Sequence, residues 1–346
     1  MEGRQPFAGR SVWTGPELEA SSDWIYLLDE SHLSEIDAGV AATRGRPYSE
    51  IRRDDFPLKR TAAVLEALAD ELENGRGIAR LKSLPVERYG EEELQRIYWA
   101  ILLHLGRPLY QSPKGDLFRA IRDVGSGAEI GPAGTMKSAR AKTLSTDSLN
   151  FHTDNADVVC LLCVANAREG GLSKVASTAR IYNEMLVRRP DLLEVLLRDF
   201  HHHHPEQVPG KVMEMPVFGV RDGRLTSVFA PANLRKAHEI MGTPPLDAAQ
   251  EEALRLLQAL GDELCLHMAF APGDIQFLNN HFVCHGRTDF ADGAEAGSRR
   301  YMMRAWLSMP SSRALPPAFG ALWGEVAAGA LRGGAALEEL GRSPAA

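Results

Sequence analysis

Short segments that favour β-strands, separated by turn residues, recur along the chain and limit the folds open to it. Strands are predicted where apolar and β-branched residues follow one another, and turns where Gly, Pro, Asn and Asp cluster. The predicted strands are 77–84, 117–124, 157–164, 172–177 and 300–308, and the predicted hairpins are 217–229, turning at Asp222-Gly223, and 264–278, turning at 272–274. Short strands surrounded by helices favour a β-sandwich or barrel over a parallel sheet.

Helical patterns lie around these strands. Leu65, Leu68 and Leu72 recur at three- and four-residue spacings, as one buried helix face requires. The predicted helices are 31–43 with Ser31 as N-cap, 62–72, 91–105, 178–188 with Thr178 as N-cap, 190–198, 246–260 and 318–331. No linker divides the chain, so we expect a single domain over 1–346. Its parts are a mainly helical N-terminal wrap (1–105), a core with helical insertions (106–310) and a C-terminal tail (311–346).

Composition excludes several classes of function. The chain has 39 Lys and Arg residues against 46 Asp and Glu, a net charge of −7, so no basic excess exists to bind nucleic acid or an anionic membrane. Four cysteines in 346 residues are too few for a disulfide scaffold. No signal segment is recognisable, and the longest apolar stretch, 158–167, is far shorter than the ~20 residues that span a bilayer. We therefore expect a cytoplasmic protein.

A metal site is suggested by the segment Phe151-His152-Thr153-Asp154. Residues two apart on a strand share a face, so His152 and Asp154 could hold one metal ion between an imidazole and a carboxylate. The same spacing is common by chance, and a polar pair on an exposed strand is the alternative. A third ligand would complete a two-His-one-carboxylate triad, which suits non-haem Fe(II) oxygenases. The downstream choices are His267, His281 and His285.

Two arginines near the end of the predicted strands could bind a carboxylate. Arg300 and Arg304 project to one face if 300–308 is a strand, and the guanidinium fork suits bidentate recognition of a carboxylate. Surface salt bridges are the alternative for both residues.

These segments together resemble a known family. FHTD, then EGGLSKV, then GDIQFLNNHFVCHGRTDF, then RRYMMRAWLS occur in the order typical of the TauD/TfdA-like Fe(II)/2-oxoglutarate-dependent dioxygenases. The resemblance covers residues 117–309. It implies a mixed, mainly β fold, a double-stranded β-helix (jelly-roll, cupin-like) core with flanking α-helices.

The resemblance also implies roles for particular residues. His152, Asp154 and His285 match the iron ligands of the family, and Arg300 matches the arginine that binds the distal carboxylate of 2-oxoglutarate. Arg304 is expected beside it, as a further residue that binds the co-substrate. Ser173 occupies the position where the family commonly uses a hydroxyl residue on the same carboxylate. The implied cofactors are Fe(II), 2-oxoglutarate as co-substrate, and O₂.

The reaction that follows is oxidation of a C–H bond in a small molecule, with release of succinate and CO₂. We predict hydroxylation, although desaturation, cyclisation and epoxidation share the same oxidant. A cupin-like divalent-metal hydrolase or isomerase, or a non-catalytic metal-binding module, is the alternative from another class. Arg300, Arg304 and Ser173 favour the oxygenase, because a hydrolase has no need for a fixed dicarboxylate clamp.

Residues that could contact the substrate precede the metal segment. Lys137, Arg140 and Lys142 lie in a loop rich in Gly, Ser and Ala, and either anchor an acidic group of the substrate or are merely solvated. Ser148 and Asn150 immediately precede the ligands. The expected partner is a small molecule, acidic if the loop anchors it, and a symmetric homo-oligomer is the prior expectation.

Three further motifs have structural interpretations. Cys160 and Cys163 form a CxxC without a second pair, which favours burial over zinc binding. The run 201–204 of four histidines is interpreted as a polar strand or loop, with adventitious metal binding as the alternative. Asn279 and Asn280 either end a strand or support His285.

Overall fold

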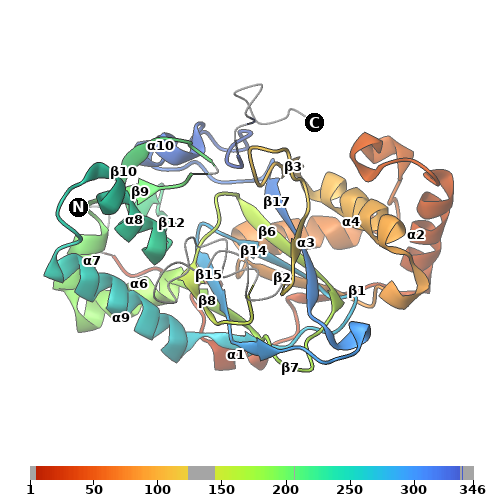
Figure 1. Cartoon of the computed structure of the whole chain (residues 1–346), viewed down its shortest axis with the longest axis horizontal. Coiled ribbons are helices and arrows are strands. Elements are labelled where there is room, and N and C mark those ends of the chain that lie inside the picture. The colour runs from red at the N-terminus through yellow and green to blue at the C-terminus, as the bar shows by residue number, and fades with distance from the viewer. Residues whose placement is uncertain (1–4, 124–144, 206, 336, 338–346) are drawn as a thin grey trace.

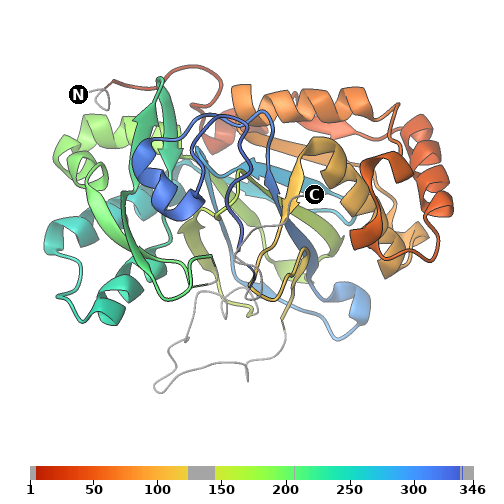
Figure 2. The ribbon, with the colours of Figure 1, turned by 90° about the horizontal axis from the view of Figure 1, so that it is seen from above.

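Two β-sheets occupy the middle of the molecule, with helices on either side (Figures 1 and 2). This computed structural model describes residues 5–123, 145–205, 207–335 and 337. Helices between residues 30 and 105 cover one flank, and helices of the 178–264 region cover the other. In the described part of the chain, no helix combines the length and the apolar character needed to cross a membrane.

The larger sheet has the order β1-β2-β14-β6-β17-β3, and β4 also pairs with β17. Its strands are β1 (Ile25–Leu27), β2 (Ile78–Lys82), β3 (Arg107–Leu109), β4 (Arg119–Ile121), β6 (Val158–Ala165), β14 (Ile275–Asn279) and β17 (Tyr301–Ser308). All pairs are antiparallel except β1 with β2. Strand β6 lies between β14 and β17, which explains its nearly continuous apolar sequence: a central strand is covered on both faces.

The smaller sheet has the order β13-β8-β15-β5 and is antiparallel throughout. Its strands are β5 (Leu149–His152), β8 (Ser173–Ser177), β13 (Leu266–Met268) and β15 (Val283–Arg287). One buried cluster contains Val159 and Leu278 of the larger sheet together with Val175 and Val283 of the smaller one. The two sheets therefore pack face to face, as predicted for a sandwich or barrel.

Short two-stranded pairs complete the β-structure described. They are β7 (Glu169–Gly170) with β16 (Phe290–Ala291), β9 (Asp199–His203) with β10 (Val212–Pro216), and β11 (Phe218–Arg221) with β12 (Arg224–Ser227). The predicted turn at Asp222-Gly223 is confirmed, since both residues have positive φ, 51° and 70°, as a tight hairpin turn requires.

The second predicted hairpin, 264–278, is wrong. Strand β13 pairs with β8 in the smaller sheet, whereas β14 pairs with β2 and β6 in the larger sheet. The turn at 272–274 therefore carries the chain from one sheet to the other. Local turn residues predicted the change of direction correctly, but the partner of each strand depends on which sheet it joins.

The N-terminal helices are α1 (Gly15–Glu19), α2 (Glu30–Ala42), α3 (Ala62–Asn74) and α4 (Glu91–Leu105), with short 3₁₀ turns at Tyr48–Glu50, Arg53–Asp55 and Val86–Arg88. Leu65, Leu68 and Leu72 are buried as predicted, in a cluster with residues of the larger sheet. The predicted N-cap is wrong. Asp29, not Ser31, caps α2, because its carboxylate accepts the amides of residues 31 and 32.

The second group of helices covers the smaller sheet and consists of α6 (Thr178–Arg188), α7 (Pro190–Leu196), α8 (Pro231–Met241) and α9 (Ala248–Leu264). Ser177 rather than Thr178 caps α6, since its hydroxyl accepts the amide of Arg180. A cap must precede the first helical turn, and Thr178 already lies in that turn.

The predicted helix 318–331 is also wrong. A 3₁₀ turn at Pro317–Phe319 leads into α10 (Gly320–Trp323), which ends after one turn, and a further 3₁₀ turn lies at Ala296–Ser298. Gly324 and Gly329 have φ of 75° and 68°, in the left-handed region that a right-handed helix excludes. Residues 324–335 instead form an irregular segment in which Arg332 and Ala335 are buried.

Candidate metal centre

Two strands of the smaller sheet carry the predicted metal ligands. His152 ends β5, His285 lies at the centre of β15, and the two residues are direct partners in the ladder. Asp154 follows β5 by two residues, in the loop rather than on the strand face. One potential ligand atom from each of the three side chains lies within 4.8 Å of the other two. The structure thus brings the three residues together. Among the described residues, they form the group whose potential ligand atoms lie close enough together to hold one metal ion.

The imidazole of His152 is oriented by its own strand. Its Nδ1 lies 2.9 Å from the carbonyl oxygen of Asn150. A neutral ring that donates from Nδ1 leaves Nε2 free to bind a metal, which is the usual arrangement of a metal-bound histidine.

His285 is held neutral by its surroundings. Burial, with the nearby charges of His152 and Arg304, lowers its pKa to about 3, although Asp154 acts in the opposite direction. Its Nε2 lies 3.8 Å from Asp154 Oδ2. A metal binds the unprotonated imidazole, so His285 is in the competent state at neutral pH.

Asp154 is ionised despite its burial. Burial alone would raise its pKa, but the charge of Arg304, the adjacent imidazoles of His285 and His152 and a hydrogen bond from Trp306 lower it to about 2. Trp306 Nε1 donates to Oδ2 at 3.0 Å, and Arg304 Nη1 lies 3.4 Å from the same oxygen. Two neutral imidazoles and one carboxylate form the donor set that suits Fe(II) with open positions, so these residues fit the metal that the sequence implies.

The guanidinium of Arg300 is a buried cation in need of an anion. Arg300 is 4% exposed, and no described residue accepts a hydrogen bond from its Nε or Nη1. Its charged end lies over the ring of Phe290, 5.5 Å from the centroid. Burial lowers its pKa to about 10, which leaves it charged at neutral pH. A buried charge without a counterion is costly, so this position favours an anionic ligand.

Ser173 bridges the two sheets. Its hydroxyl donates to Gln276 Oε1 of β14 at 2.9 Å, and no described residue accepts from Gln276 Nε2. Ser173 follows Gly171 by two residues, and the Cα of Gly171 is so close to Arg300 that an added Cβ would lie 3.2 Å from the arginine Nε. Ser173 thus lies near the same part of the core as Arg300.

Arg304 contacts the metal carboxylate. Besides Asp154, its guanidinium donates from Nε to Gln111 Oε1 at 2.8 Å, and Gln111 in turn donates to the Arg304 carbonyl. The ladder of β17 shifts register between Tyr301 and Met302. Arg300 precedes β17 and lies beyond this shift, so the alternation of side chains along the strand does not extend to it. The prediction that Arg300 and Arg304 project to one face depended on that alternation.

Sequence reasoning missed Arg287, Gln111 and Gln276. Arg287 is buried two residues after His285 on β15, and its Nη2 donates to the carbonyls of Ser145 and Asp147. Burial and the charge of Arg300 lower its pKa to about 9. Arg287 could have been predicted from the sequence, because it lies two residues after His285 and would share its strand face. No comparable signal marks Gln111 or Gln276.

The other predicted residues have varied positions. Ser148 and Asn150 are exposed. Lys137, Arg140 and Lys142 lie outside the described residues. His281 is 2.8 Å from Asp157 and therefore serves a different carboxylate, and His267 is exposed on β13.

The remaining motifs follow their structural interpretations. Cys160 and Cys163 are free thiols buried in β6. The histidine run 201–204 lies in and just after the polar strand β9.

Comparison with known proteins decides among the classes of function left open by the sequence. The family model described as "Taurine catabolism dioxygenase TauD, TfdA family" matches residues 44–306. The chain belongs to this family. The protein is therefore a 2-oxoglutarate-dependent non-haem iron dioxygenase that uses Fe(II), 2-oxoglutarate and O₂, as predicted. The comparisons give no support to the hydrolase and binding-module alternatives.

Individual relatives agree with this assignment. The FR-33289 synthase of Streptomyces rubellomurinus is 29% identical over 340 residues, which cover 94% of this chain and 97% of the relative. A taurine hydroxylase-like protein of Stachybotrys chartarum is 28% identical over 310 residues, 85% of this chain and 77% of the relative. The crystal structure of an asparagine oxygenase superposes with a TM-score of 0.64 at 22% identity, over 90% of this chain and 100% of that one. This likeness confirms the predicted jelly-roll fold.

Proposed function

We propose that this TauD/TfdA family dioxygenase hydroxylates a C–H bond of a small molecule that carries an acidic group. The substrate gains one oxygen atom of O₂, and 2-oxoglutarate takes the other as it is cleaved to succinate and CO₂. The observation that carries the proposal is the convergence of His152, Asp154 and His285 within 4.8 Å, with His285 buried and the other two residues partly buried. In this proposal the three side chains hold Fe(II), which when bound supplies the O₂ chemistry.

Arg300 and Ser173 bind the distal carboxylate of 2-oxoglutarate in this proposal. The Nε and Nη1 atoms of this buried guanidinium have no acceptor among the described residues, and each forms with Nη2 a pair of parallel donors that a carboxylate can accept, which supports this role. Arg304 acts at the other end of the site, beside the metal ligands. It borders Asp154 and is held by Gln111, so it orients the metal carboxylate and adds positive charge for the bound co-substrate.

An acidic substrate is supported by the charges around the metal ligands. Arg287, Arg300 and Arg304 are all buried. Asp154 lies beside Arg304, and Asp123, Asp147 and Asp292 act on Arg287. In this proposal Arg300 binds the distal carboxylate of 2-oxoglutarate, and the charges of Arg287 and Arg304 favour an anionic group on the substrate.

Anaerobic addition of Fe(II) and 2-oxoglutarate tests the co-substrate site. We expect a metal-to-ligand charge-transfer band that is lost in His152→Ala. A substrate screen then scores succinate released above the background without substrate. Each acid is compared with its own neutral amide or ester as the matched control. Equal stimulation of succinate release by acid and neutral forms would contradict the acidic-substrate proposal.

A further inference from the structure

Each residue from Asp154 to Asp157 is hydrogen-bonded to one of two distant parts of the chain, Asn280 or a segment near the C-terminus. The loop 153–157 begins where Thr153 donates its amide to the carbonyl of Phe229 at 2.9 Å and accepts the Phe229 amide on its hydroxyl. The next four residues are bound by Asn280 and by the segment Ala327–Ala335, which we term the C-terminal arm. Neither partner contributes a metal ligand.

Asn280 makes three hydrogen bonds to this loop. Its Oδ1 accepts the backbone amide of Asp154 at 3.0 Å, its Nδ2 donates to the Ala156 carbonyl at 2.8 Å, and its own amide donates to the Asp157 carbonyl at 3.0 Å. Asn280 is fully buried and lies between β14 and β15, five residues before His285. One side chain therefore joins the two segments that carry the three ligands.

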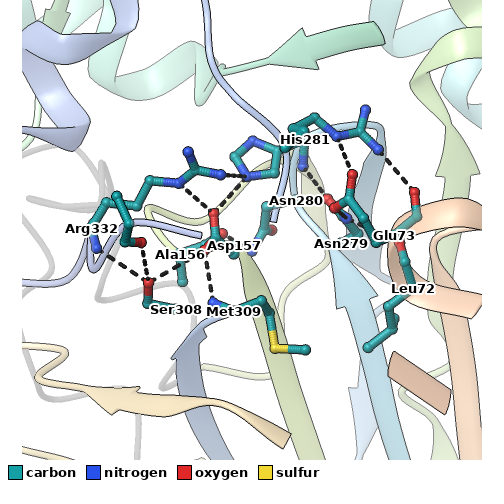
Figure 3. A network of polar contacts seen from close by, with 12 residues as sticks. Leu72, Glu73, Ala156, Asp157, Asn279, Asn280, His281, Ser308, Met309 and Arg332 are labelled. Carbon is teal, nitrogen blue, oxygen red and sulfur yellow. Dashed lines mark hydrogen bonds and ion pairs between the residues drawn. The ribbon is translucent and has the colours of Figure 1, made fainter. Parts of the chain in front are cut away.

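The C-terminal arm contacts the same loop. Gly334 donates its amide to the Asn155 carbonyl at 2.8 Å, and Asn155 Nδ2 donates back to the Gly334 carbonyl at 3.3 Å. Arg332 Nε donates to Asp157 Oδ1 at 2.7 Å. Figure 3 shows Asp157 lying between Arg332 and His281, with Ser308 and Met309 at its other oxygen.

We propose that Asn280 and Arg332 are positioning residues of the iron centre, and that the C-terminal arm is thereby a structural part of it. The inference rests on the proposed assignment of Asp154 as an iron ligand. Asn280 fixes the peptide on which the Asp154 carboxylate is mounted, and Arg332 fixes the end of the same loop through Asp157. Without them, Asp154 is free to follow the attraction of Arg304, 3.4 Å away, out of the iron-binding position.

The expected size of the effect follows from outer-shell partners of other metal sites, whose loss weakens metal affinity by about 10- to 100-fold. We expect that weakening in Asn280→Ala and in Arg332→Met. Arg332→Lys keeps the charge beside Asp157 and should recover part of the affinity. Fe(II) affinity is measured by anaerobic titration, together with the thermal unfolding midpoint of the iron-free protein and hydrogen exchange of the amides of residues 153–157.

Asn279→Ala is the matched control. Asn279 is the neighbouring buried asparagine. Its Nδ2 donates to the Leu72 carbonyl and to Glu73 at α3, and its Oδ1 accepts the amide of His281, so its side chain reaches the ligand loop only indirectly, through His281 (Figure 3). We expect this variant to lose thermal stability, to keep wild-type iron affinity and to leave exchange in 153–157 unchanged. Asn155→Ala, which removes one hydrogen bond to Gly334, is a milder loop variant if Asn280→Ala does not fold.

Two outcomes would overturn the inference. One is wild-type iron affinity in Arg332→Met and also in Asn280→Ala, or in Asn155→Ala if Asn280→Ala does not fold. The other is a loss of affinity that follows the unfolding midpoint equally in Asn279→Ala and Asn280→Ala. Asp154→Ala separates the two proposals: if it binds iron as tightly as wild type, the ligand assignment fails, whereas loss of iron in Asp154→Ala alone leaves that assignment standing and refutes the positioning role.

Discussion

His285 of β15 lies directly opposite His152 of β5, and their ring centroids are 4.4 Å apart. Because the two strands are antiparallel neighbours, the ladder itself fixes how far apart the imidazoles can be. Asp154 then needs only to turn back at the end of β5 to bring its carboxylate to both rings. Backbone hydrogen bonds of the smaller sheet therefore hold the two imidazoles near each other before any metal binds.

Loss of His285 should abolish iron binding. His285→Ala removes one of three ligands, and we expect no charge-transfer band with Fe(II) and 2-oxoglutarate under anaerobic conditions. His267→Ala is the control, because His267 is exposed on β13 and outside the ligand group. If His267→Ala loses the band and His285→Ala keeps it, the proposed ligand set is wrong.

Arg300→Met should raise the KM for 2-oxoglutarate. Truncating one partner of a buried charge pair costs about 2–5 kcal/mol, which corresponds to about 30-fold or more. Iron affinity without the co-substrate should be unchanged. Arg299→Met is the control, since the adjacent Arg299 is exposed. A similar KM in both variants would remove Arg300 from the co-substrate site.

Ser173→Ala should have a smaller effect on the same constant. A single hydrogen bond to a charged group contributes about 1.5–3 kcal/mol, so the KM for 2-oxoglutarate should rise by about 10-fold or somewhat more. Ser173→Thr keeps the hydroxyl and should stay closer to wild type. Steady-state succinate formation measures both variants, and an unchanged KM in Ser173→Ala argues against a contact with the co-substrate.

Gly171→Ala should impair the co-substrate site through Arg300. Gly171 has φ of 69°, and a Cβ there would lie 3.2 Å from Arg300 Nε and 3.3 Å from Phe290 Cβ. Gly210 has the same φ but no atom within 4 Å of an added Cβ, so Gly210→Ala imposes the backbone strain alone. We expect a raised KM for 2-oxoglutarate in Gly171→Ala only; matching KM values would attribute the effect to strain.

Acid should destabilise the fold partly through His202. Burial, with the charges of His204 and His201, lowers the pKa of His202 to about 3, although its hydrogen bond to the Met215 carbonyl opposes this. The unfolded chain binds a proton below pH ~6.5, whereas the folded chain does not until pH ~3. Stability from this group is therefore complete above pH ~6.5 and falls by about 1.4 kcal/mol per pH unit below it.

His202→Gln removes this titration and keeps a donor for Met215. Urea unfolding at several values between pH 4 and 7 should give a shallower loss of stability in the variant than in wild type. Parallel curves for the two proteins would show that His202 does not contribute to the acid sensitivity.

The sequence alone determined much of the chemistry. The order of FHTD, EGGLSKV, the segment around His285 and the final arginine-bearing strand predicted the ligand types and identified the family. Local periodicity also predicted elements whose partners lie nearby in the chain, such as α3 and the hairpin at Asp222-Gly223. These succeed because a helix face and a tight turn are encoded within a few residues.

Tertiary structure decided what local patterns could not express. His281 and His285 lie four residues apart and were both possible ligands by sequence, but Asp157 lies 2.8 Å from His281 and His285 stands opposite His152. The strands β13 and β14 join different sheets although a turn connects them. The contact of Arg332 with the loop after Asp154 joins residues 175 positions apart. Such pairings depend on packing of the whole core. The free energy of that packing comes from contacts between distant segments, so a short sequence pattern cannot predict them.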